Sequence, residues 1–273
     1  SIFIDLDNTY KIKDYNYKIS GALEKGKFEL LSPFKNSLIT EEIKEIYLSD
    51  FKISSNFRPK KIKWSGEGKY SLNNQDYFKV ILENNLNKNS TNLDLNFDYG
   101  NPLEIDLINY KKANNSISNL SLNLEKTKNK IKINELTYKH EKNLIKIENL
   151  ILRENSLASF NKIDVMTSNN DFSIQSGKKI LIRGKKFDAT NLAKFFKTKK
   201  GENRFKKISN KIEVDFKNIK VPMSEKLKNF KLLGEIKNGR FIKISSKGDF
   251  GGNNFLDISM KKDKKSDKKY LEI

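Results

Sequence analysis

The protein has 273 residues, with one histidine, four prolines and no cysteine, and its formal net charge is +20 at pH 7. The lack of cysteine excludes disulfide bonds and cysteine-based metal sites. The charge alone does not indicate nucleic-acid readout, because lysine is spread over almost every expected strand and arginine, the better bidentate phosphate ligand, is scarce. We therefore expect no specific nucleic-acid partner.

The ends and the hydropathy set further bounds. The sequence begins with Ser1 and stops inside an alternating run at residues 270–273, and we expect it to be a piece of a longer protein. No apolar run approaches the roughly 20 residues of a membrane-spanning helix. The mean hydropathy of −0.69 is low, but regular alternation of Leu, Ile and Phe with polar residues argues against disorder.

The first ninety residues alternate apolar and polar side chains, which is typical of strands with one buried face. The run from Ile62 to Leu72 is the longest, and its inward positions include Gly66 and Gly68. Glycine inside a strand often marks a bulge or a close approach to the backbone. We expect something to lie against this strand.

The stretch from Thr91 to Val165 contains a series of short strands with the same period-two pattern. Turn residues such as Gly100-Asn101-Pro102 separate them. Because short connections permit antiparallel pairing and a parallel pair needs a long crossover, the pattern predicts an antiparallel meander. One face of it should be apolar and the other strongly polar.

Beyond this stretch the pattern predicts one helix and several further strands. Asp188 or Thr190 can cap a short amphipathic helix near 189–199, within a possible helical insertion at 188–200. Asn238-Gly239, between two alternating runs, is the strongest hairpin signal. The predicted fold is all-β (mainly): a long antiparallel meander curled into an open groove, forming one continuous region over 1–273 without a clear internal boundary.

Two features raise the question of catalysis. The segment Ile2–Thr9, with Asp5 and Asp7, resembles the first motif of haloacid-dehalogenase-type phosphatases, a resemblance that implies a nucleophile and an acid/base with Mg²⁺. The all-strand pattern lacks the parallel α/β context of that family, so this is a remote alternative. His140, the single histidine, falls between charged residues, and we expect it in an exposed turn. We predict no enzyme, no metal and no cofactor.

The segment 234–260, which contains Asn238-Gly239 and Gly248-Asp249-Phe250-Gly251-Gly252, resembles the β-hairpin region of AsmA-like proteins. Phe187-Asp188 after a strand fits the same group, which includes TamB-like proteins. The resemblance implies a periplasmic, groove-forming β protein of a Gram-negative bacterium, anchored to the inner membrane by a segment outside this sequence. It also implies a part in phospholipid movement and outer-membrane biogenesis.

From these patterns we expect a non-enzymatic hydrophobic groove for phospholipid transfer or outer-membrane lipid homeostasis, whose partner is a phospholipid or another acyl-chain lipid. The alternative is a structural or adhesive β-sandwich or solenoid with a filled core. The candidate groove-lining residues share the apolar phase of the central strands: Leu93, Leu95, Phe97, Leu103, Ile105, Leu107, Leu120, Leu122, Leu124, Ile131, Ile133, Ile145 and Ile147.

Overall fold

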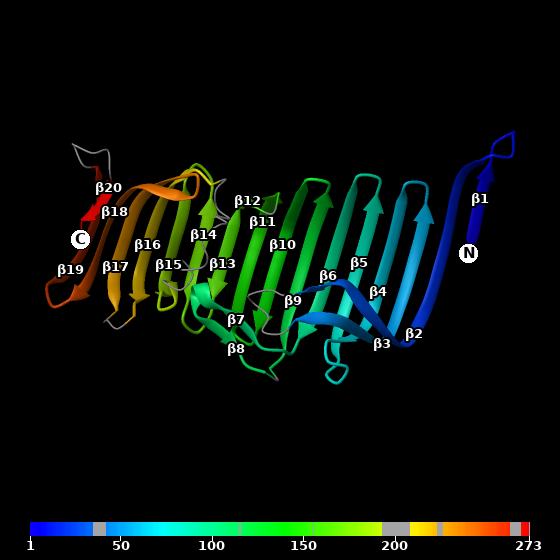
Figure 1. The fold of residues 1–273 in the computed structure, drawn as a ribbon, viewed down its shortest axis with the longest axis horizontal. Helices are drawn as coiled ribbons and strands as arrows, with labels where there is room; N and C mark the ends of the chain where they lie inside the picture. Colours follow the sequence, from blue (N-terminus) through cyan, green and yellow to red (C-terminus); the bar gives the residue numbers. More distant parts are fainter. Residues whose placement is uncertain are drawn as a thin grey trace. The chain divides into compact units, whose positions relative to one another are not determined.

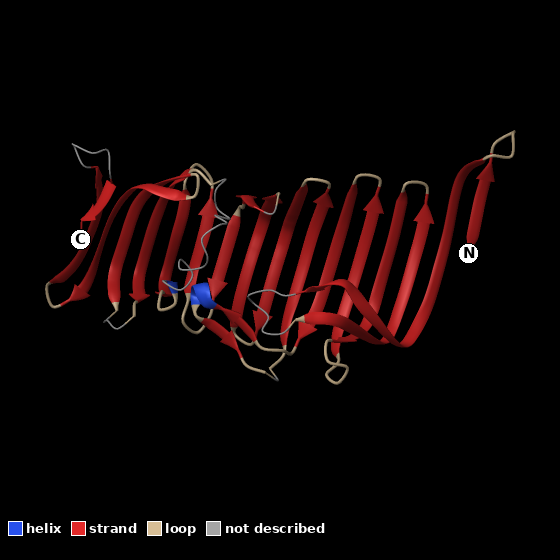
Figure 2. Ribbon diagram, in the orientation of Figure 1, coloured by secondary structure: helices blue, strands red, loops and turns tan. Residues whose placement is uncertain are grey.

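A computed structural model describes residues 1–34, 42–114, 116–154, 156–192, 208–222, 226–262 and 269–272. The chain is all-β, and its strands form open, mostly antiparallel meanders (Figures 1 and 2). Within the described residues, helix is limited to the 3₁₀ turn η1 (Asp106–Ile108) and to Leu192. The predicted fold class is confirmed, whereas the helix predicted near 189–199 falls, beyond Leu192, outside the described residues.

Contacts between Cα atoms divide the chain into two compact units, which we describe separately. The first unit comprises Ser1–Leu103 and Lys112–His140, and the second comprises Glu104–Lys111 and Glu141–Ile273. The expectation of one continuous region over 1–273 concerns the extent of the repeating pattern, and this division does not decide it.

Eight strands build the first unit, and each pairs antiparallel with the one before it. They are β1 (Ile2–Leu6), β2 (Ile12–Phe34), β3 (Ile43–Arg58), β4 (Lys61–Ser71), β5 (Phe78–Asn87), β6 (Ser90–Tyr99), β9 (Ser118–Thr127) and β10 (Lys130–His140).

The register of these strands aligns their apolar residues in rows across one face. Leu82, Leu95 and Leu122 lie opposite one another on β5, β6 and β9, and Leu136 continues the row on β10. Because facing side chains on one side of an antiparallel pair interact directly, every such row stabilises the register. A slip of one residue would move the apolar side chains to the polar face.

The core of the first unit is centred on Phe51, which is 5% exposed and packs with Tyr70 and Val80. Phe51 follows Asp50, whose φ of 50° belongs to a bulge in β3. A Cβ atom on Gly66 would lie 2.5 Å from the Phe51 ring, and one on Gly68 would lie 2.6 Å from the Phe51 Cα. The close approach predicted at these two glycines is therefore made by Phe51.

The second unit contains ten strands of its meander and a small hairpin. The meander strands are β11 (Asn143–Arg153), β12 (Ser156–Ser159), β13 (Lys162–Met166), β14 (Asp171–Ser176), β15 (Ile180–Asp188), β16 (Asn210–Lys220), β17 (Leu227–Lys237), β18 (Arg240–Gly251), β19 (Asn254–Lys262) and β20 (Lys269–Glu272). The strands β7 (Leu103–Ile105) and β8 (Tyr110–Lys112) pair with each other on either side of η1.

One pair in the second unit departs from the predicted antiparallel order. Strands β15 and β16 are parallel, with Ile180 opposite Ile212 and Gly184 opposite Phe216. A parallel pair requires a crossover of a dozen or more residues, and the chain between Asp188 and Asn210 is long enough to supply it. The strictly antiparallel order was therefore wrong at this position, although the other pairings of the unit are antiparallel.

The Asn238-Gly239 hairpin is confirmed. The two residues join β17 to β18, and their φ values of 50° and 71° are both positive. A type I′ turn requires positive φ at both central positions, and Asn-Gly adopts this conformation at the lowest steric cost. This local signal therefore fixed the strand pairing correctly without help from tertiary contacts.

Candidate functional site

Eight of the predicted groove-lining residues lie together on the apolar face of the first unit. Leu93 faces Leu124, Leu95 faces Leu122, and Phe97 faces Leu120, so the side chains of β6 and β9 alternate in the same phase. On β10, Ile133 faces Leu124, and Ile131 lies two positions before it. The structure brings together these eight: Leu93, Leu95, Phe97, Leu120, Leu122, Leu124, Ile131 and Ile133.

The side chains of this face are half-buried rather than enclosed. All eight residues retain intermediate exposure, whereas the residues of the Phe51 cluster are almost fully buried. Toward β1, β2 and β3 the same face becomes more exposed, and Ile19 and Ile53 reach 57% and 43%. The face is therefore a partly open apolar surface, and the described residues of this unit cover it fully only around Phe51.

Two of the predicted residues belong to the second unit. Ile145 and Ile147 lie on β11, where they face Val165 and Ile163 of β13. Ile145 is buried with 9% exposure, and Ile147 is half-buried. The second unit thus repeats the one-sided apolar pattern of the first.

The remaining three predicted residues lie outside the meander strands. Leu103 and Ile105 belong to β7, and Leu107 lies in η1 with 37% exposure. Asn109 ends η1 with φ 46° and ψ 44°, and its N–H donates to the carbonyl of Asp106. The left-handed residue closes a tight turn here, so Leu107 is not in the strand that its spacing predicts. Ile108, which that spacing places on the polar side, is 4% exposed.

Each unit also has a shallow hollow, and both lie on the polar face. The hollow in the first unit has a volume of about 560 Å³ and is lined by Ser20, Ser54 and Ser65, which alternate with the apolar-face residues of β2, β3 and β4. The hollow in the second unit, about 620 Å³, is lined by the facing residues Asp164, Ser173, Arg183 and Asp215. None of the thirteen predicted residues lines either hollow.

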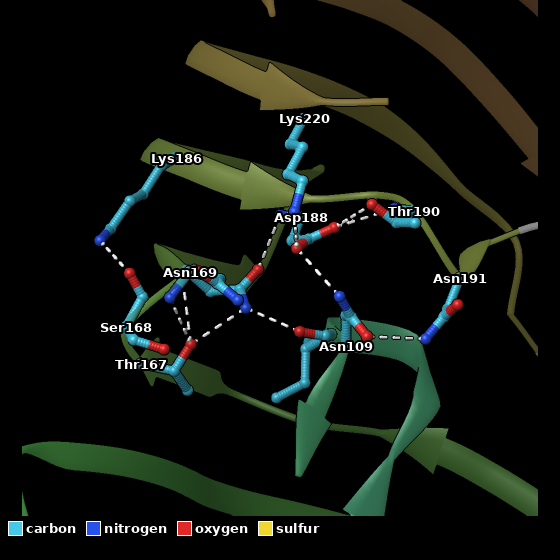
Figure 3. Close-up of polar contacts among 11 residues, drawn as sticks. Asn109, Thr167, Ser168, Asn169, Lys186, Asp188, Thr190, Asn191 and Lys220 are labelled. Atoms are coloured by element: carbon cyan, nitrogen blue, oxygen red, sulfur yellow. Dashed lines mark hydrogen bonds and ion pairs between the residues drawn. The ribbon is translucent and has the colours of Figure 1, made fainter. Parts of the chain in front are cut away.

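A buried polar network is the feature that the sequence did not predict. Asp188 and Asn170 have no exposed side-chain surface, and Figure 3 shows the contacts around them. The Asn170 Oδ1 accepts the N–H of Asp188 at 2.9 Å, and its Nδ2 donates to the carbonyl of Ile108 at 2.7 Å. Asn170 thereby joins the β13–β14 turn to β15 and to η1.

The carboxylate of Asp188 completes the network. Its Oδ1 accepts from the N–H of Thr190 at 3.0 Å and from the Thr190 hydroxyl, and its Oδ2 accepts from Asn109 Nδ2 at 3.0 Å. The Lys220 Nζ lies 3.4 Å from the same Oδ2. The carboxylate oxygens are thus already engaged by protein donors, so the network holds the start of the crossover, η1 and β16 together and offers no ligand site.

The ionisation of Asp188 should couple to stability. Burial disfavours the charged carboxylate, but the hydrogen bonds from Thr190 and Asn109 together with Lys220 outweigh it, so its pKa lies below the usual 3.8. A depressed carboxyl pKa stabilises the folded state above the unfolded-state pKa, and this stabilisation is lost as the pH falls through the folded-state value.

We expect the second unit to lose stability as the pH falls below about 4. The Asp188→Asn variant should lose less over the same range, since it has no carboxyl proton to gain at this position. Urea unfolding followed by circular dichroism at pH 6 and pH 3 measures both slopes. Equal pH dependence in the two proteins would show that Asp188 does not contribute.

Lys112 has a structural role in the first unit. It is 2% exposed, and its Nζ donates to the carbonyls of Gly100 at 2.9 Å and Asn101 at 2.8 Å while lying 5.5 Å from the centre of the Tyr99 ring. Burial lowers the pKa of the ammonium group. The ammonium group thus satisfies carbonyls where the chain leaves β6.

The residues considered for catalysis are placed differently from a phosphatase site. Asp5 and Asp7 lie at the β1–β2 hairpin, where Asp5 is 3.8 Å from Lys13 and the Asp7 Oδ1 accepts the N–H groups of Thr9 and Lys11. The motif therefore forms a strand-to-strand turn in an all-β chain. His140 is 8% exposed at the end of β10, so its predicted exposure was wrong, because the strand continues through the position read as a turn.

Two findings complete the description of the site. Within the described residues, no three His, Cys, Asp or Glu side chains are grouped so that they could hold a metal ion, and no helix is both long and apolar enough to cross a bilayer. Comparison with family models, with curated proteins and with solved structures found no match to this chain.

Proposed function

We propose that this chain is a non-enzymatic segment that holds acyl-chain lipid against the apolar face of its sheets. Its role would be phospholipid transfer or outer-membrane lipid homeostasis in the bacterial envelope. The observation that carries the proposal is the intermediate exposure of the aligned rows on β6, β9 and β10. A dry sandwich would bury such side chains beneath a second layer, and the described residues of the first unit supply cover only around Phe51.

Energetics favour an acyl chain as the cover. Transfer of apolar surface from water contributes about 25 cal/mol per Å², so the half-exposed leucines gain from any hydrocarbon placed on them. Moving two acyl chains through water costs on the order of 20 kcal/mol, at about 0.8 kcal/mol per methylene. A row of leucines that continues from strand to strand lowers this barrier without any covalent chemistry.

The rest of the proposal concerns location and rests on the sequence resemblance alone. The protein would lie in the periplasm of a Gram-negative bacterium, anchored to the inner membrane through a segment outside this sequence. Its bound partner would be a phospholipid or another lipid with acyl chains.

A structural scaffold with a filled core remains the competing proposal. The Phe51 cluster favours it, because there the face is packed by Leu23, Ile46 and Leu48 of the same chain. The two proposals differ in what covers the leucine rows: hydrocarbon in one, protein in the other.

Replacing Leu122 by aspartate should lower acyl-chain binding by about tenfold or more, since a charge would be placed where hydrocarbon must lie and each 1.4 kcal/mol is a factor of ten. Leu122 sits mid-row, between Leu95 and Leu136. Titration of the delipidated protein with a fluorescent fatty acid measures the change. The matched control is Ser121→Asp, one residue away on the polar face.

The proposal predicts that Ser121→Asp binds the fatty acid as the wild type does. Far-ultraviolet circular dichroism establishes that both variants keep their strands. If the wild type binds no fatty acid, or if both variants bind as tightly as the wild type, the scaffold proposal replaces the lipid proposal.

A further inference from the structure

The hairpin turns at one end of the first unit form a basic edge. The register places Phe57, Ile62, Leu86, Thr91, Lys126 and Ile131 in one terminal row across β3, β4, β5, β6, β9 and β10. The turns just beyond this row are residues 58–61, 87–90 and 127–130. Figure 1 shows them along the upper ends of these strands.

We define the basic edge as Arg58, Lys60, Lys61, Lys88, Lys126, Lys128 and Lys130. The three turns contain no aspartate or glutamate. Within the part of the chain that the structure describes, no ion pair involves any of these seven cations. Six of them are exposed, and Lys130 is half-buried.

Carboxylates near this edge are already engaged by other groups. Glu83 lies further down β5 and pairs with Lys63 at 3.0 Å. In the β1–β2 hairpin, Asp5 pairs with Lys13 and Asp7 accepts N–H groups of its own turn. The β4–β5 turn at the opposite end contains Asp76 and no lysine, so the positive charge is concentrated at one end.

We propose that the basic edge docks the protein on an anionic membrane surface. Successive turns along the edge are separated by two strands, or about 10 Å, which is near the screening length of about 8 Å at physiological salt. Each turn therefore contributes its attraction to a flat anionic surface nearly independently. The long lysine stems let the ammonium groups reach head groups while the neighbouring apolar residues stay close to the interface.

The terminal row beneath the turns favours a membrane over a nucleic acid. Phe57, Ile62 and Leu86 end their strands on the apolar face directly under the charged turns, and Ile62 is 36% exposed. Such a pairing of apolar side chains with lysine suits the boundary between head groups and acyl chains. Arg58 is the only arginine of the edge, whereas phosphate recognition in nucleic acids favours arginine.

The basic edge is separate from the leucine rows, and its test does not depend on whether those rows bind acyl chains. The variant K61E/K88E/K128E reverses one charge in each turn. The control K79E/K139E/K231E makes the same change in net charge at exposed lysines outside the edge. Cosedimentation is measured with vesicles of phosphatidylcholine alone and with 30% phosphatidylglycerol added.

We expect the wild type to bind the phosphatidylglycerol vesicles, to bind the neutral vesicles much less, and to dissociate as salt rises. The edge variant should bind on the order of 100-fold more weakly, from about fivefold for each lysine lost near the surface. The control and Leu122→Asp should bind within a few-fold of the wild type. Equal weakening in control and edge variant, absence of binding to anionic vesicles, or tighter binding to a duplex oligonucleotide would overturn the proposal.

Discussion

An Asp188→Ala variant is expected to have a free energy of unfolding about 3–5 kcal/mol below that of the wild type, measured for the second unit. The carboxylate has no exposed surface, and its removal leaves the N–H and hydroxyl of Thr190 and the amide of Asn109 without their acceptor. A buried donor that loses its partner costs about 1–3 kcal/mol. Hydrogen exchange of the β15 and β16 amides measures the loss where it occurs.

The control for this variant is Asp257→Ala. The Asp257 side chain is 61% exposed, and its partner Lys247 lies 3.5 Å away on the surface. An exposed pair of this kind is worth about 0–1 kcal/mol, so the control should unfold nearly as the wild type does. A similar loss in the two variants would mean that the buried network is not a special source of stability.

A Gly184→Ala variant is expected to lose about 3 kcal/mol, at the upper end of the usual cost of overpacking. A Cβ atom there would lie 2.4 Å from the Cβ of Phe172 and 2.5 Å from the carbonyl oxygen of Asp171. Neither atom is at the end of a flexible side chain. Phe172 and Phe216 also pack edge-to-face across this glycine with ring centres 5.7 Å apart, so β14 and β15 would have to separate.

Gly177→Ala provides the matched control for the Gly184 substitution. Gly177 lies in the turn between β14 and β15, and a Cβ atom added there meets nothing within 4 Å. Its stability should change by less than about 1 kcal/mol, the scale of glycine-to-alanine effects on the unfolded chain. Thermal unfolding of both variants decides the matter, and a stable Gly184→Ala variant would mean that the two strands can shift apart at little cost.

Much of this fold could be predicted from the sequence because its causes are local. Alternation fixes which face of a strand is apolar, and Asn238-Gly239 specifies a turn with positive φ at both residues. The glycines at 66 and 68 also carried a signal, since only a close neighbour explains them. The neighbour itself, Phe51, could not be identified, because the bulge at Asp50 that directs it depends on pairing between β3 and β4.

The features that were missed depend on contacts between distant parts of the chain. The network of Asp188, Asn170 and Asn109 joins residues 79 and 18 positions apart, and isolated Asp and Asn residues in turns give no sign of burial. The parallel pairing of β15 with β16 was missed for the same reason. The candidate site follows this division: eight of its residues share a face because alternation dictates it, whereas Leu107 lies in a turn set by Asn109.

The most direct test of the apolar face uses Trp64, the single tryptophan of the chain. Trp64 lies half-buried on that face, opposite Asn84 of β5 and in the same phase as Leu82. Its fluorescence is recorded while delipidated protein is titrated with a fatty acid brominated in mid-chain, since bromine quenches tryptophan only on contact. We predict saturable quenching by the brominated acid and none by its unbrominated parent, whereas binding of the brominated acid without any quenching would contradict the assignment of the apolar face.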